Sequence, residues 1–155
     1  MIEVHICKTD QDWEVAKAIT KDYMKWLGMD LSFQNTEKEF EGFQTMYGAP
    51  QGCFIYATVN GEVAGGVATR KLDTDICEMK RLYVHDQFKG LGIGKQLCEQ
   101  ILEISHSLGY RKMRLDTVDK LTAAISLYKK MGFYEIPAYY FNPDPTARFM
   151  EIEFN

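Results

Sequence analysis

The stretch from Glu78 to Lys95 reads E-M-K-R-L-Y-V-H-D-Q-F-K-G-L-G-I-G-K and decides the fold. Its first half is apolar and β-branched, which predicts a strand that ends at Val84. A polar turn with glycines at positions 90, 92 and 94 follows, and an amphipathic helix over 96–108 comes directly after it. Such a turn lets backbone N–H groups point at a ligand from a helix N-terminus. This stretch therefore predicts a ligand that carries phosphate.

The rest of the chain predicts an α/β fold with one mixed sheet, in a single domain over residues 1–155. Period-2 patterns and turn signals predict strands at 2–6, 53–59, 62–71, 76–84, 112–118, 133–138 and 148–154. Period-3.6 patterns and capping signals predict the other helices at 10–27, 37–47 and 122–131. The expected sheet thus has about seven strands and is flanked by four helices.

The composition excludes several classes of protein. A net charge of −4, from 18 basic and 22 acidic residues, argues against nucleic acid as a partner. The sequence shows no signal peptide and no apolar run long enough to span a bilayer, so a cytoplasmic protein without a membrane partner is expected. The four cysteines and three histidines lack metal-ligand spacing, so we expect buried reduced thiols and no metal.

The glycine turn does not match the sequence motifs of two common phosphate-binding loops. A P-loop needs Ser or Thr after its Gly-Lys pair, but Gln96 stands there, and its first glycine would fall on Lys89. The dinucleotide fingerprint needs a third glycine at position 95 or 97, and these positions hold Lys95 and Leu97. Both failures argue against an enzyme that binds a nucleotide phosphate through one of these loops.

What remains is Q-x-x-G-x-G, met by Gln87, Gly90 and Gly92, and a later segment in which Ala124, Leu127-Tyr128 and Gly132-Phe133 form A-x-x-L-Y-x-x-x-G-F. Together these motifs resemble those of the GCN5-related N-acetyltransferase (GNAT) superfamily, and the element order matches over nearly the whole chain. Residues 78–84 and 114–117 further resemble a subgroup of small bacterial acetyltransferases. The resemblance implies transfer of an acetyl group from acetyl-CoA to a primary amine of a small molecule or peptide, by direct attack in a ternary complex. The alternative is a non-catalytic acyl-CoA-binding module.

The resemblance also implies which residues bind acetyl-CoA. Backbone groups of Leu82, Tyr83 and Val84 are expected to hold the pantetheine arm as an added strand would. The residues expected around the pyrophosphate are Gln87, Phe88, Lys89, Gly90, Leu91, Gly92, Ile93, Gly94 and Lys95. A helix N-terminus and two lysines suit phosphate electrostatically, although the lysines alternatively only solvate the helix end.

Amide formation needs a group that takes a proton from the ammonium and one that protonates the leaving thiolate. Superfamily members that acetylate histones carry a general-base Glu at a similar place, so Glu78 is the candidate base. Its alternative role is a structural ion pair with Lys80, Arg81 or Arg114. Strand periodicity places Glu78 and Val84 on one face, with Lys80 and Leu82 between them.

Tyr128 is the candidate acid, because the tyrosine at this place in many superfamily members points at the sulfur of CoA. Its alternative role is core packing, since it belongs to an apolar stripe of its helix. The superfamily often has Asn at the position of Leu121, which puts one CoA contact in doubt, and Thr122 is the expected N-cap in its place.

The acceptor site is expected where superfamily members differ, between the first helices and near the C-terminus. The candidates there and at the end of strand 112–118 are Trp26, Phe33, Asp116, Thr117, Tyr139 and Tyr140. The aromatic residues are alternatively core residues or the contact of a homodimer.

Overall fold

The computed structural model describes residues 1–28, 40 and 42–155. Seven strands form one sheet in the order β1-β2-β3-β4-β5-β7-β6. The strands are β1 (Ile2–Ile6), β2 (Cys53–Val59), β3 (Glu62–Lys71), β4 (Ile76–Val84), β5 (Lys112–Val118), β6 (Tyr134–Ile136) and β7 (Ala147–Glu153). The α-helices in the described ranges are α1 (Asp10–Leu27), α3 (Phe43–Tyr47), α4 (Ile93–Ser107) and α5 (Thr122–Met131). The predicted mixed sheet of seven strands with four helices is confirmed.

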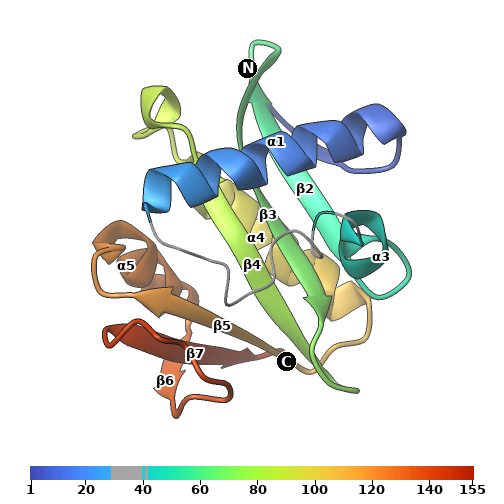
Figure 1. The fold of residues 1–155 in the computed structure, drawn as a ribbon. Coiled ribbons are helices and arrows are strands. Elements are labelled where there is room, and N and C mark those ends of the chain that lie inside the picture. Colours follow the sequence, from blue (N-terminus) through green and yellow to red (C-terminus); the bar gives the residue numbers. More distant parts are fainter. Residues whose placement is uncertain (29–39, 41) are drawn as a thin grey trace.

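The helices cover both faces of the sheet, with α1 and α3 on one face and α4 on the other (Figure 1). The larger core cluster lies on the α4 side and includes Leu97, Ile101, Met113 and Tyr128. The second cluster lies under α1 and α3 and is rich in aromatic rings. Helices on both faces explain why a central strand such as β2, which reads C-F-I-Y-A-T-V, is nearly continuously apolar.

The sheet divides into two parts between β4 and β5. These two strands pair in parallel over Ile76–Glu78 and residues 112–114. Beyond that point β4 stays paired with β3, while β5 stays paired with β7 along its whole length. The two strands consequently diverge (Figure 1). Among the described strands, none pairs with the β5-facing edge of β4 from Met79 onward.

A β-bulge interrupts β4 next to this division. Gly66 faces Tyr83 and Ala68 faces Lys80, so β4 holds one residue more than β3 between these pairs. Arg81 lies in the bulge and has a φ of 63°, a conformation that costs roughly 1–3 kcal/mol in a residue other than glycine. Bulges of this kind often lie beside active sites and redirect side chains.

The bulge reverses the alternation of side chains along β4. Met79 packs in the cluster under α4, and beyond the bulge Leu82 and Val84 pack against the same cluster. Tyr83 joins the cluster under α1 instead. The prediction that Glu78 shares one face with Leu82 and Val84 is therefore wrong, because the extra residue exchanges the two faces.

The local signals mostly hold. Thr9 and Asp12 form a complete capping box at α1, and Asn60-Gly61 turns the β2–β3 hairpin with positive φ at both residues. Helix α4 begins three residues earlier than predicted, at Ile93. Strand β6 has only three residues, and the N-cap of α5 is Leu121 rather than Thr122.

The predicted helix over 37–47 lies partly outside the described residues, as do its capping residues Thr36 and Glu39. Its described part is interrupted, because Gly42 is a turn residue and α3 begins at Phe43. Across the described ranges, no helix has the length and apolarity needed to cross a membrane.

Candidate active site

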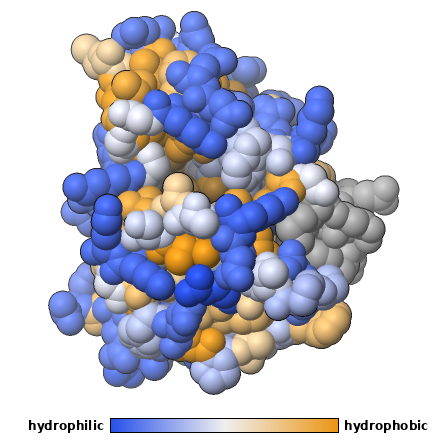
Figure 2. Space-filling view, turned by 90° about the vertical axis from the view of Figure 1, so that its left-hand side faces the viewer, coloured by the Kyte–Doolittle hydropathy of each residue, from blue (hydrophilic) through white to orange (hydrophobic). Residues whose placement is uncertain are grey.

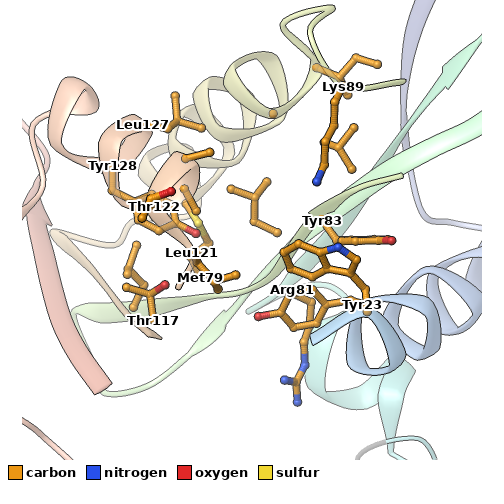
Figure 3. A pocket seen from close by; sticks show the side chains of 18 of the residues that line it. Tyr23, Met79, Arg81, Tyr83, Lys89, Thr117, Leu121, Thr122, Leu127 and Tyr128 are labelled. Carbon is orange, nitrogen blue, oxygen red and sulfur yellow. The ribbon is translucent and has the colours of Figure 1, made fainter. Parts of the chain in front are cut away.

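A cavity of about 530 Å³ lies where β4 and β5 diverge. Its walls come from the end of α1, the bulged half of β4, the glycine turn, β5 and the start of α5 (Figure 3). In the space-filling view, apolar surface lies in a hollow between hydrophilic margins (Figure 2). An apolar cavity with a few convergent polar groups is the usual form of a small-molecule site.

The glycine turn forms one end of the cavity. Gly90 and Gly92 have φ of 85° and 78°, and a Cβ at either position would meet nothing within 4 Å. These glycines are therefore required by their backbone conformation and leave open space beside the turn. Gly92 is also the N-cap of α4, and no side chain caps this helix end. The first N–H groups of α4 remain available to a ligand.

The start of α5 presents a second helix end to the same cavity. Its N-cap, Leu121, makes no side-chain hydrogen bond to the helix. Residues Thr122, Ala123 and Ala124 line the cavity. Two helix N-termini that lack side-chain caps thus converge on one space, and both carry partial positive charge.

Lys89 and Lys120 add whole positive charges to these helix ends, and both line the cavity. The Lys89 ammonium lies 2.8 Å from an Asp86 carboxylate oxygen and 4.9 Å from the centre of the Trp26 ring. It therefore bridges the glycine turn and the end of α1.

Most residues predicted for acetyl-CoA line this cavity. The lining residues among them are Leu82, Tyr83, Val84, Phe88, Lys89, Gly90, Gly92, Ile93 and Gly94. Gln87, Leu91 and Lys95 do not line it. The Gln87 amide instead lies 3.5 Å from a Glu62 oxygen, and Leu91 is 52% exposed. The three glycines of the turn therefore line the cavity with their backbone, whereas the side chains of Gln87, Leu91 and Lys95 lie outside it.

Tyr128 faces the cavity from α5 and is 6% exposed. Burial raises the pKa of its phenol well above the usual value, and Tyr23, Cys98 and Asp116 raise it further. Tyr128 therefore stays protonated at neutral pH and can donate a proton or a hydrogen bond.

An aromatic wall stands opposite Tyr128. Tyr23 and Trp26 of α1 pack against Tyr83 of β4 with ring centres 5.8 and 5.5 Å from it. Figure 3 shows Tyr23, Tyr83 and Arg81 on this side and Tyr128 with Thr122 on the other. The sequence motifs did not point to Tyr23 or Arg81, because α1 lies far away in the chain and the bulge leaves no sequence signal.

Glu78 does not line this cavity. The residue is 1% exposed, and its Oε1 accepts bonds from Arg70 Nε at 2.9 Å and Nη2 at 2.8 Å. Its Oε2 accepts a 2.6 Å bond from the Tyr139 hydroxyl. Arg70 faces Glu78 across the β3–β4 ladder. The ion-pair partner of Glu78 is therefore Arg70, which was not among the three partners considered from the sequence. Arg114, one of these, pairs with Glu151 instead.

A second cavity of about 360 Å³ contains Glu78 together with Arg70, Leu72, Lys80, Tyr139, Tyr140 and Phe141. The predicted acceptor residues are therefore divided. Trp26, Asp116 and Thr117 line the first cavity, whereas Tyr139 and Tyr140 line the second. Phe33 lies outside the described residues.

Asp116 connects the two cavities through hydrogen bonds. Its Oδ2 accepts bonds from the Tyr140 hydroxyl and, at 3.0 Å, from Asn142 Nδ2. The next residue, Thr117, is 5% exposed, and its hydroxyl has no hydrogen-bond partner within the described part of the chain. This hydroxyl can donate or accept a hydrogen bond toward the cavity.

Known proteins are similar to this chain in sequence and in fold. The model of the acetyltransferase (GNAT) family matches residues 17–133. An uncharacterised N-acetyltransferase of Schizosaccharomyces pombe is 38% identical over 98% of this chain and 94% of its own length. The chain therefore belongs to the acetyltransferase (GNAT) family, a class of acetyl-CoA-dependent N-acyltransferases, as the two sequence motifs indicated.

Solved structures agree on the fold. An acetyltransferase from Streptococcus agalactiae superposes with a TM-score of 0.78 at 18% identity, covering 99% of this chain and 98% of its own. The PaiA N-acetyltransferase of Thermoplasma acidophilum, solved in complex with coenzyme A, superposes with a TM-score of 0.71 at 19% identity and covers 98% and 99%.

Proposed function

We propose that this protein transfers the acetyl group of acetyl-CoA to a primary amine, by direct attack of the amine within a ternary complex. The observation that carries the proposal is the cavity at the division of the sheet. It combines two helix N-termini without side-chain caps, the open edge of β4 and a buried, protonated Tyr128.

The residues at the glycine turn fit a pyrophosphate. Anions bind well at helix N-termini, where unpaired N–H groups and the helix dipole both favour negative charge. Gly90 and Gly92 leave space for close approach, and the start of α4 supplies the donors. Lys89 strengthens the attraction as a charged group at the rim.

The open edge of β4 fits an amide-containing arm. Tyr83 and Val84 pair with β3 on one edge, and none of the described strands pairs with the other edge of this segment. A pantetheine arm can hydrogen-bond there in the manner of an added strand. This arrangement directs the thioester toward the bulge at Arg81 and toward Tyr128, away from the glycine turn.

The cysteines support direct attack rather than a covalent acyl-enzyme. All four are buried free thiols, and none lines either cavity. Burial raises the pKa of Cys7 and Cys98 to about 12 and that of Cys53 to about 11. A thiol that stays protonated is a poor nucleophile.

In the proposed reaction Tyr128 protonates the thiolate as the carbon–sulfur bond breaks. Glu78 was the sequence candidate for the base, and its geometry limits how it acts. Because Arg70 and Tyr139 engage both oxygens, Glu78 reaches the reacting atoms only through the Tyr139 hydroxyl or water. We therefore assign Glu78 the role of a positioning residue for the Tyr139-Tyr140 segment.

The test is a thiol-release assay with acetyl-CoA against a panel of primary amines, amino acids and peptides, together with calorimetric titration of acetyl-CoA. We expect acetyl-CoA to bind and at least one amine to release CoA well above the hydrolysis background. Binding without release for any amine would favour the non-catalytic acyl-CoA-binding module. Absence of binding would overturn the assignment of the cavity.

A further inference from the structure

We propose that Asp116, rather than Glu78, is the carboxylate that binds the ammonium group of the acceptor and receives its proton. This inference rests on the proposed function and adds a catalytic residue to it. It also defines the acceptor as an amine that arrives protonated.

The first observation is the position of Asp116. It lines the same cavity as Tyr128, from β5, on the opposite side of the division from the pantetheine edge of β4. A thioester held between these elements therefore has Tyr128 and Asp116 within one cavity. Glu78 lines only the other of the two cavities.

The second observation is how the Asp116 carboxylate is held. Two donors, the Tyr140 hydroxyl and Asn142 Nδ2, both bind Oδ2. Among the described residues no donor bonds Oδ1. Oδ2 thus fixes the side chain, and Oδ1, which no described residue occupies, can accept a bond from a ligand. A carboxylate whose orientation is fixed by its neighbours is preorganised for binding a ligand group.

Glu78 offers the opposite arrangement. Its Oε1 is engaged by the Arg70 guanidinium and its Oε2 by Tyr139. An incoming ammonium would have to displace one of these partners from a side chain that is 1% exposed. Separating a charge pair whose carboxylate is buried is strongly unfavourable, so Asp116 is the more accessible of the two carboxylates.

The proton balance of the step is complete without another reactant. The acceptor ammonium binds Asp116 and transfers one proton to it, and the free amine attacks the thioester carbonyl carbon. The carbon–nitrogen bond forms and the carbon–sulfur bond breaks. The thiolate takes the proton of Tyr128, Tyr128 regains one from the nitrogen, and Asp116 releases its proton to water.

The charged and titratable groups around Asp116 come from several elements. They are Tyr23 of α1, Glu78 and Arg81 of β4, Lys120 before α5, Tyr128 of α5, and Tyr139 and Tyr140 near the C-terminus. Burial is the main cause that raises the pKa of each of these four tyrosines. These tyrosines stay protonated in the physiological range. A pH dependence of the rate between neutral pH and about pH 9.5 is therefore expected to follow the deprotonation of the acceptor amine.

The test compares Asp116→Asn with wild type in steady-state kinetics from about pH 6.5 to about pH 9.5, using whichever of benzylamine, n-butylamine and lysine reacts fastest. We expect the KM for the amine to rise roughly tenfold and kcat/KM to fall roughly 100-fold near neutral pH. The loss should shrink as the pH approaches the pKa of the amine, about 10, because free amine then needs no base. Calorimetry should show unchanged acetyl-CoA binding.

Two other variants make the result specific. Asp119→Asn removes an exposed carboxylate of the following turn that pairs with Arg148 at 3.5 Å, and it should behave as wild type. Glu78→Gln should lower kcat with an unaltered pH profile. The Asp116 assignment is overturned if Asp116→Asn matches Asp119→Asn while Glu78→Gln acquires the pH-dependent loss. If wild type turns over none of the three amines, the same comparison is made with the fastest amine of the wider panel. Only failure of that whole panel overturns the proposed function, whereas an Asp116→Asn variant that matches wild type on a reacting amine overturns the Asp116 assignment alone.

Discussion

At the residue scale, the two tyrosines that face opposite cavities differ in what they can do. The Tyr128 hydroxyl lines the cavity assigned to acetyl-CoA. The Tyr139 hydroxyl is committed to Glu78 at 2.6 Å. Only the first has direct access to a leaving thiolate, so substitution of the two hydroxyls should separate proton donation from positioning.

Tyr128→Phe should lower kcat roughly 10- to 100-fold, because the phenol that protonates the thiolate is lost while the ring remains. The KM for acetyl-CoA should change little. Pre-steady-state thiol release measures the effect directly. Equal rates for the variant and wild type would leave Tyr128 as a core residue, the alternative weighed from its helical stripe.

Tyr139→Phe should lower kcat less than tenfold and should not alter the pH profile, since it removes one donor from Glu78 and leaves the Arg70 ion pair intact. The measurement is kcat over the same pH range. A pH-dependent loss in this variant would show that Glu78 exchanges protons through Tyr139 and would contradict its positioning role.

At the element scale, the glycine turn and the β4 bulge shape the cavity that we propose for acetyl-CoA. The turn is recognisable in the sequence from Gly90 and Gly92, because glycine readily adopts the positive φ that both residues have. The bulge does not, because Arg81 carries a conformation that its residue type disfavours. Strand periodicity therefore placed Glu78 correctly along β4 but on the same face as Val84, which the bulge prevents.

Gly92→Ala should weaken acetyl-CoA binding by about tenfold, because a left-handed conformation in alanine costs roughly 1–2 kcal/mol and the turn would relax. Calorimetric titration measures the loss. Gly109→Ala is the matched control, since Gly109 also has positive φ, 101°, with nothing within 4 Å of an added Cβ. It should lower stability similarly and leave binding unchanged; equal binding losses in both variants would contradict the role of the turn.

Gly65→Ala should disrupt the β3–β4 pairing behind the cavity. A Cβ at this position would lie 2.2 Å from the Tyr83 carbonyl oxygen and 2.9 Å from Val84 Cα. We expect a loss of roughly 1–3 kcal/mol in the free energy of unfolding, measured by urea denaturation. Gly94→Ala, whose Cβ would meet only side-chain atoms at 3.9 Å, should cost nothing comparable.

At the scale of the whole molecule, the order of helices and strands and the family could be predicted from the sequence. The division of the predicted site residues between two cavities could not. Capping residues, the Asn60-Gly61 turn and hydrophobic periods are local signals, and the structure follows them. The division between β4 and β5 is a property of pairing across the sheet, as is the separation of Glu78 from Asp116. No local pattern encodes it.

Buried tyrosines connect the site to global stability at high pH. Burial raises the pKa of Tyr23 and Tyr128 above the usual value of about 10. Their contribution to stability is therefore complete below about pH 10 and is lost as the pH rises from there toward the folded-state values. Unfolding titrations above pH 10 should show this decline, and a smaller decline in Tyr128→Phe than in wild type.

The central claim is that the acetyl group passes directly from bound acetyl-CoA to an amine, without a covalent acetyl-protein intermediate. The most direct measurement is a single-turnover reaction with isotopically labelled acetyl-CoA and the fastest panel amine, followed by mass spectrometry of protein and products. The account predicts equal amounts of CoA and labelled N-acetyl amine, with no labelled protein at any time. Acetylated protein that precedes the product, or CoA released with free acetate instead of N-acetyl amine, would contradict it.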